Sequence, residues 1–174
     1  MIYNALVQPH LNYGILLWGN KTKRIIKLQK WSVRAITCSK YNAHTDPLFI
    51  KLNLLKVQDI YKLNLLKFYH KYKSESLPKY FSGMFETIFA NHSYHTRHKE
   101  QSVIARGKSS IADHSVRFSL PNLLVKTHHL ITSKISTHSF TGFSNYIKLF
   151  YISQYNSICT IDNCYICNRN DPSV

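Results

Sequence analysis

The sequence predicts a mainly α fold, in which a small helical bundle is followed by an irregular or extended segment and short C-terminal helices. Apolar residues make up 44% of the 174 residues, which is enough for a packed core. Only five glycines are present, well below the average of about 7%, so the tight turns and bulges that sheets need are scarce. Long stretches place apolar residues at helical three-and-four spacing, which outweighs the strand preference of 12 tyrosines and nine phenylalanines.

The first 18 residues predict helical segments that pack into the core. Leu6, Leu11 and Leu16 are apolar packing positions, and Pro9 must either kink a helix or begin a new one. This stretch is too short and too polar to cross a membrane, and no basic segment precedes it as in a signal peptide. We therefore expect no membrane partner and a cytoplasmic or nuclear location.

The segment from Lys21 to Lys40 predicts a helix that carries the candidate site. At 100° per residue, four cations lie within about 60° of one another on the helical wheel. Most of the remaining circumference is apolar, so we expect the helix to be buried on most sides. These four candidate nucleic-acid-binding residues, called the basic row below, are Lys23, Lys27, Lys30 and Arg34.

The absence of acidic residues distinguishes the basic row from an ordinary solvated helix face. Such a face usually mixes Glu with Lys at i,i+4 spacing, and Lys21–Lys40 contains no carboxylate. An ordinary solvated face remains the alternative interpretation.

Two further helices are predicted between residues 46 and 78. Asp46 is the expected N-cap of a short helix whose first residue is Pro47. A longer helix begins near Lys56 and should end before Pro78. Its apolar stripe consists of Val57, Ile60, Tyr61, Leu65, Phe68 and Tyr72, and the lysines expected to face outward are Lys62, Lys67 and Lys71.

The chain divides by pattern into three parts. Residues 1–90 predict the helical domain, and residues 91–121 are polar, His-rich and without a helical period, which predicts an extended or loop linker. Residues 122–174 predict a short helical C-terminal region, with helices at Asn122–Val125 and Phe143–Tyr155 and a frayed tail that contains cysteines.

Charge indicates a polyanionic partner. The net charge is +15, and residues 1–80 hold 14 of the basic side chains but only three of the acidic ones. Such an excess repels itself in the compact state, so nucleic acid is the favoured partner and an anionic membrane surface the second.

The sequence does not predict catalytic activity for this chain alone. Two-metal polymerases and nucleases need converging carboxylates, and no two of the eight acidic residues are adjacent in the sequence. A Gly-x-Ser-x-Gly nucleophile elbow and a phosphate-binding glycine loop are both absent from the sequence. We expect no cofactor and no small-molecule substrate.

Two groups of residues are candidate metal ligands. Cys159, Cys164 and Cys167 have thiolate spacing, but no His or Cys follows, so only His138 or Cys38 could supply a fourth ligand by folding back. The histidines at 92, 95 and 98 would alternate faces in an extended segment. We predict ordinary reduced thiols and no metal site.

The order of six motifs is more specific than any one of them. The motifs are YNALVQPHLNYGILLWG (3–19), IIKLQKWSVRAIT (25–37), LFIKLNLLKVQDIYKLNLLKFYHKY (48–72), LPKYF (77–81), HSYHTR (92–97) and SVRFSLPNLL (115–124). In this order they resemble the C-terminal portion of jockey-like, non-LTR (LINE-type) retrotransposon reverse transcriptases. The resemblance covers roughly residues 2 to 155.

The resemblance implies a thumb-like helical region and the segment that follows it. Family members carry a Tyr/Phe-x-Asp-Asp pair in the palm and often an endonuclease, and neither is found in these 174 residues. The opening motif would normally follow the palm, so we expect Met1 to mark a truncated copy or an internal start. His92, Tyr94, Thr96 and Arg97 match a family motif without an assigned role.

Three functions follow as expectations. The first is a reverse-transcriptase fragment without its catalytic palm, which binds the phosphate backbone of RNA or an RNA/DNA duplex without sequence preference. The second is a helical protein-interaction module, which exposed aromatic surface around Trp18 and Trp31 would favour. The third, polymerase activity of the chain itself, is not expected.

Overall fold

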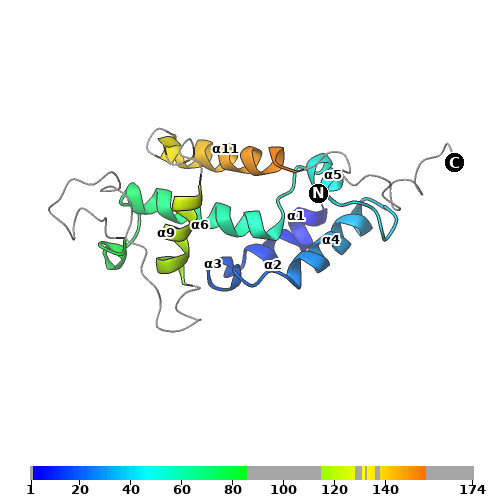
Figure 1. Cartoon of the computed structure of the whole chain (residues 1–174), viewed down its shortest axis with the longest axis horizontal. Coiled ribbons are helices and arrows are strands. Elements are labelled where there is room, and N and C mark those ends of the chain that lie inside the picture. Colours follow the sequence, from blue (N-terminus) through cyan, green and yellow to red (C-terminus); the bar gives the residue numbers. More distant parts are fainter. Residues whose placement is uncertain (1, 86–114, 128–130, 132, 136–137, 156–174) are drawn as a thin grey trace.

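All regular secondary structure in the described part of the chain is helical. The computed structural model describes residues 2–85, 115–127, 131, 133–135 and 138–155, and no strand occurs in these ranges. The prediction of a mainly α fold is therefore confirmed (Figure 1). The helices are α1 (Ile2–Leu6), α2 (Gln8–Asn12), α3 (Ile15–Trp18), α4 (Ile25–Ile36), α5 (Asp46–Lys51), α6 (Val57–Lys73), the 3-10 helix η1 (Lys79–Phe81), α9 (Val116–Lys126) and α11 (Phe140–Ser153).

Helix α6 is the centre of the fold. It contacts α3, α4, α9 and α11, which lie around it (Figure 1). The expected apolar stripe is buried or half-buried, but Leu63 and Leu66 are buried as well, so α6 is covered on more than one face. Lys62 and Lys67 are therefore half-buried instead of facing outward, whereas Lys71 is exposed as expected.

The first three helices are short because the sequence interrupts them. Pro9 lies in the first turn of α2, so it begins a new helix, which is one of the two predicted outcomes. Gly14 has φ +59, a left-handed conformation that ends α2 and lets α3 start in a new direction. Gly19 passes so close to the Tyr61 ring that a Cβ atom would collide with it. The loop after α3 can therefore lie directly on α6.

A buried glutamine holds α4 against its neighbours. The Gln29 side chain is 1% exposed. Its Nε2 donates to the Tyr3 hydroxyl at 2.7 Å and to the Leu55 carbonyl at 2.8 Å, and its Oε1 accepts from the Val57 N–H at 2.8 Å. One amide thus joins α1, α4 and the first residue of α6.

The start of α5 differs from the prediction by one residue. Thr45 is the N-cap and makes no side-chain capping bond, and Asp46 is the first helical residue, followed by Pro47. The Asp46 carboxylate instead accepts from Lys56 Nζ at 2.7 Å. The Asp46 carboxylate thus joins the start of α5 to the residue before α6.

The predicted linker is wrong over its last residues. Residues 116–121 belong to α9, and Pro121 lies inside this helix, where the absence of its N–H removes one backbone hydrogen bond. Leu120 is fully buried in the common core, which stabilises the helix in spite of the proline. Residues 91–114 of the predicted linker lie outside the described residues.

Helix α11 lies along α6, and it begins three residues earlier and ends two residues earlier than the predicted helix at Phe143–Tyr155. It begins at Phe140, where the Ser139 side chain caps it by accepting from the Gly142 N–H. Phe143 and Ile147 are fully buried against α6. The His70 ring lies 5.2 Å from the Phe143 ring and its Nε2 is 3.0 Å from the His138 carbonyl oxygen, so α6 also fixes the start of α11.

Candidate nucleic-acid interface

The basic row lies at the edge of the exposed face of α4. Helix α4 contacts α1, α5 and α6, and Gln29 and Val33 mark the middle of its buried side. Lys23, in the turn before the helix, and Lys27 are exposed. Lys30 and Arg34 are half-buried because they lie nearer the packed side. The structure therefore leaves all four cations accessible to different degrees.

The expectation that α4 is buried on most sides is wrong. Leu28 is 64% and Trp31 67% exposed, and Ala35 is exposed as well. The helix lies at the edge of the bundle and packs on one side only, so three of its apolar positions face outward. The exposed face thus combines cations with one large aromatic ring.

Arg34 has a structural contact in addition to its charge. Its Nε donates to the Ala43 carbonyl at 2.8 Å and so ties the loop between α4 and α5 back to α4. The same loop carries Tyr41, which is among the exposed aromatic residues. The Arg34 guanidinium is therefore held by a hydrogen bond to the backbone. Lys23 and Lys27 are exposed at the surface.

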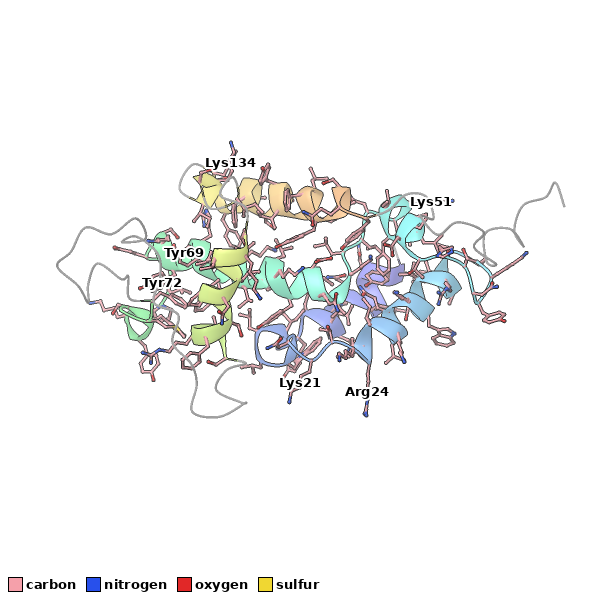
Figure 2. All side chains as sticks on the ribbon, in the orientation of Figure 1. Lys21, Arg24, Lys51, Tyr69, Tyr72 and Lys134 are labelled. Carbon is pink, nitrogen blue, oxygen red and sulfur yellow. The ribbon has the colours of Figure 1, made fainter. Side chains whose placement is uncertain are left out.

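Two cations that the sequence did not place in the basic row enlarge the basic surface. Lys21 and Arg24 are exposed and extend outward along the same edge of the molecule (Figure 2). Arg24 lies one turn before Lys27 and two turns before Trp31, so these three residues share the outer face of α4. The sequence held this signal, because at 100° per residue Arg24 falls beside Trp31 and outside the basic row.

The described carboxylates do not neutralise this surface. Asp46 pairs with Lys56, and Asp59 pairs with Lys62 at 2.9 Å. Glu75 follows the far end of α6, at the end of the molecule opposite to α4 (Figure 1). Within the ranges that the structure describes, no ion pair joins a residue of the basic row to a carboxylate.

Asp59 has a second role in joining the start of α6 to Tyr155, the last described residue. The Tyr155 hydroxyl donates to Asp59 Oδ2 at 2.7 Å and accepts from the Lys56 N–H at 2.9 Å. Burial, and then the bond to Asp59, raise the pKa of Tyr155 well above its usual value. Burial also raises the pKa of Tyr151 to about 12, with the Asp59 charge as the second cause. Asp59 is therefore a structural acceptor and not a free carboxylate.

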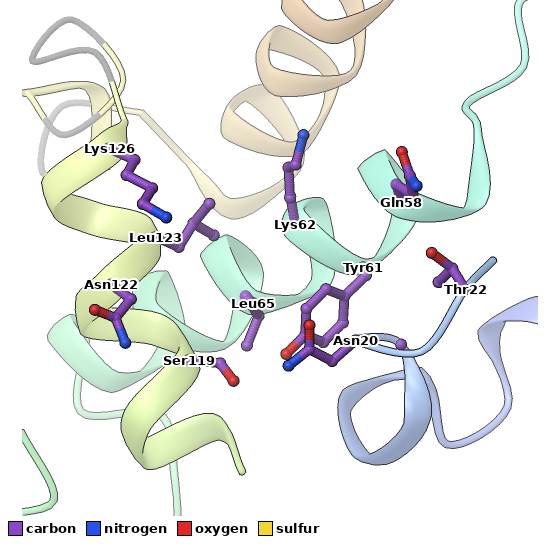
Figure 3. A pocket seen from close by; sticks show the side chains of 11 residues that line it. Asn20, Thr22, Gln58, Tyr61, Lys62, Leu65, Ser119, Asn122, Leu123 and Lys126 are labelled. Carbon is purple, nitrogen blue, oxygen red and sulfur yellow. The ribbon is translucent and has the colours of Figure 1, made fainter. Parts of the chain in front are cut away.

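A cleft of about 400 Å³ lies between α6, α9 and the loop after α3 (Figure 3). Lys126 extends across the cleft toward α6. The loop after α3 lines the cleft as far as Thr22, and Lys23 of the basic row is the next residue. The Tyr61 hydroxyl is buried and has no hydrogen-bond partner among the described residues. The lining contains no carboxylate, histidine or cysteine, so it offers no metal ligands of these types, and its ionisable groups are Lys62, Lys126 and Tyr61.

The structure tests the metal prediction only in part. In the described ranges, no three His, Cys, Asp or Glu side chains come together as a metal site, and Cys38 is an exposed free thiol. Cys159, Cys164 and Cys167 lie outside the described residues, as do the histidines at 92, 95 and 98. Among the helices that are described, none combines the length and apolar character needed to span a membrane.

Comparisons with known proteins add no identification. No protein-family model, curated protein or solved structure matches this chain.

Proposed function

We propose that this chain is the C-terminal, thumb-like and post-thumb portion of a non-LTR retrotransposon reverse transcriptase, and that it retains non-specific binding to nucleic acid. Its partner is RNA or an RNA/DNA duplex, bound through the phosphate backbone in the cytoplasm or nucleus. The order of the six sequence motifs supports the family, and the mainly helical fold is compatible with it.

The exposed, acid-free surface of α4 carries the binding proposal. Seven cations and no carboxylate lie between Lys21 and Lys40. In the described residues, the ion pairs of Asp46 and Asp59 are made with Lys56 and Lys62 and involve no cation of this segment. Phosphate contacts from Lys and Arg position a protein on nucleic acid without reading its bases. Binding should therefore be insensitive to sequence.

Salt dependence provides the decisive experiment. Fluorescence anisotropy should be titrated with labelled RNA and RNA/DNA duplexes of two unrelated sequences at several salt concentrations. About four phosphate contacts give a slope of roughly −3 to −4 in a plot of log affinity against log salt. Equal affinity for both sequences with this slope supports the proposal. Affinity that does not change with salt contradicts it.

Polymerase activity is not part of the proposal. In the described part of the chain, Asp46 and Asp59 are each held by a lysine, so neither is free to bind a catalytic metal ion. A primer-extension assay with Mg²⁺ or Mn²⁺ should yield no product. Template-dependent product would contradict this assignment.

A second candidate function is protein interaction through α1 and α3. Ile2 and Leu6 lie one turn apart on α1 and are each about two-thirds exposed, and Leu17 on α3 is also exposed. Large apolar side chains that remain exposed can mark interaction surfaces. Size-exclusion chromatography with light scattering in high salt tests this function. A dimer that Leu6→Glu converts to a monomer would support it, and a wild-type monomer would count against it.

A further inference from the structure

Trp31 is the feature of α4 that phosphate binding does not explain. Its side chain is two-thirds exposed although tryptophan is a large apolar residue that is usually buried. No ring or cation–π contact in the described part of the chain involves its indole. The ring therefore does not contribute to the core and is accessible from solvent.

The position of the ring among the cations indicates its use. Lys27 lies one turn before Trp31 and Arg34 nearly one turn after it, so a cation flanks the ring on each side along the helix. Proteins that bind single-stranded nucleic acid combine a positive track for the backbone with aromatic rings on which bases stack. A duplex offers the same phosphates, but its bases are already stacked and cannot reach the ring.

We propose that α4 binds unpaired nucleic acid, with Trp31 stacking on a base while Lys27 and Arg34 contact the phosphates on either side. This inference rests on the proposed function, because it needs the phosphate contacts of α4, and it adds a preference for single strands over duplexes. It also assigns Trp31 a binding role that the charge pattern alone does not.

An anionic membrane surface fits α4 less well. Membrane-surface helices place a broad apolar face in the lipid. Here the apolar side of α4 packs on the core through Val33 and its neighbours, and only Leu28 and Trp31 remain as large apolar side chains that face outward. This leaves too little apolar surface for insertion, whereas one exposed ring is sufficient to stack on a base.

Two substitutions separate ring stacking from apolar contact. Trp31→Phe retains an aromatic face and Trp31→Leu retains only apolar area. Tyr80→Ala is the matched control, because Tyr80 is an exposed aromatic residue in η1, at the end of the molecule opposite to α4 (Figure 1). Affinities for a 12-nucleotide single strand and for a blunt duplex of equal length should be compared at one salt concentration, and a titration over several concentrations should give the salt slope for each.

We expect the single strand to bind about tenfold more tightly than the duplex, the factor that corresponds to about 1.4 kcal/mol of stacking. Trp31→Leu should remove this advantage while the duplex affinity and the salt slope stay unchanged. Trp31→Phe should keep most of it, and Tyr80→Ala should keep all of it. Circular dichroism of each variant checks that the helices are intact.

Tryptophan fluorescence gives a second measurement that does not depend on the variants. The chain has two tryptophans, and the indole N–H of Trp18 is held by the Tyr13 carbonyl at 2.7 Å. Stacking on Trp31 should quench about half of the emission when the single strand binds, and the duplex should quench less. Iodide, which quenches exposed tryptophans, should no longer quench Trp31 once the single strand is bound.

The outcomes distinguish this inference from the function on which it rests. Equal, salt-dependent affinity for single strands and duplexes, without quenching, overturns the stacking proposal but leaves phosphate binding in place. The absence of salt-dependent binding to either form removes both. Retention on phosphatidylserine vesicles that excess oligonucleotide does not displace also overturns the stacking proposal, in favour of a membrane surface.

Discussion

The backbone N–H of Val57 donates to the side-chain oxygen of Gln29 at 2.8 Å. This bond caps the first turn of α6 with a side chain from α4, because Lys56, the N-cap residue, provides no side-chain capping bond. The buried amide of Gln29 thus joins α4, which carries the basic row, to the central helix α6. The orientation of α4 relative to α6 depends on this contact.

Gln29→Leu should destabilise the fold strongly. The substitution keeps the volume but leaves the Val57 N–H, the Leu55 carbonyl and the Tyr3 hydroxyl without their partner. Buried polar groups that lose a partner cost about 1–3 kcal/mol each, so we expect a loss of roughly 3 kcal/mol in the free energy of unfolding. Urea denaturation followed by circular dichroism measures it.

Gln58→Leu is the matched control for this prediction. Gln58 is an exposed glutamine in the first turn of α6, so the same replacement there should change stability by less than about 0.5 kcal/mol. Equal losses in the two variants would show that the Gln29 bonds do not hold the fold together.

The helices can be predicted from periodicity, but their burial cannot. Lys21–Lys40 and Lys56–Lys73 are recognisable as helical because apolar spacing is a local property of the sequence. Which faces are covered depends on neighbours that are distant in sequence. Helix α6 is covered by four other helices and α4 on one side only, so the helical wheel underestimates burial of the first and overestimates burial of the second.

The candidate site shows the same limit. The sequence identifies the four cations of the basic row and the absence of acids near them, and both depend on residue type alone. The helical wheel places Arg24 beside Trp31, but it does not show that both are exposed, because exposure follows from the side on which α4 packs. The prediction also omits the part of α9 before and at Pro121, because proline normally disrupts a helix. In the structure, contacts of Leu120 with the core stabilise the helix there.

Two tyrosine-to-phenylalanine substitutions should differ in their effect on stability. Tyr155→Phe removes a hydroxyl that donates to Asp59 and accepts from the Lys56 N–H, and the loss should be about 1–3 kcal/mol. Tyr61→Phe removes a buried hydroxyl that has no partner among the described residues, so it should be neutral or slightly stabilising. Thermal unfolding of both variants under one condition makes the comparison. Similar losses would contradict the assigned bonds.

Stability should fall in alkaline solution. Burial raises the pKa of Tyr151 to about 12, above its ordinary value of 10. Between these values the unfolded chain loses the phenolic proton and the folded chain keeps it, so the contribution of Tyr151 is complete below pH 10 and is lost as pH rises to about 12. For one such group the slope is at most about 1.4 kcal/mol per pH unit.

The alkaline loss can be assigned to Tyr151 by substitution. Urea unfolding of the wild type and Tyr151→Phe should be compared from about pH 9 to 12, and the wild type should lose stability relative to the variant as pH rises, because phenylalanine has no proton to lose. Burial lowers the pKa of Lys67, so this lysine contributes the opposite slope in both proteins and cancels from the difference. Parallel curves would show that Tyr151 titrates alike in the folded and unfolded chains.

Removal of one cation from α4 should weaken binding by the equivalent of a single phosphate contact. Lys27 is exposed on the outer face and has no ion pair among the described residues, so Lys27→Gln should remove one interaction with phosphate without disturbing the core. The log–log salt slope should become shallower by about 0.7 for a single strand or 0.9 for a duplex. Lys79→Gln, an exposed lysine in η1, is the control and should leave the slope unchanged. Equal changes in both variants would mean that overall charge, and not the α4 surface, determines binding.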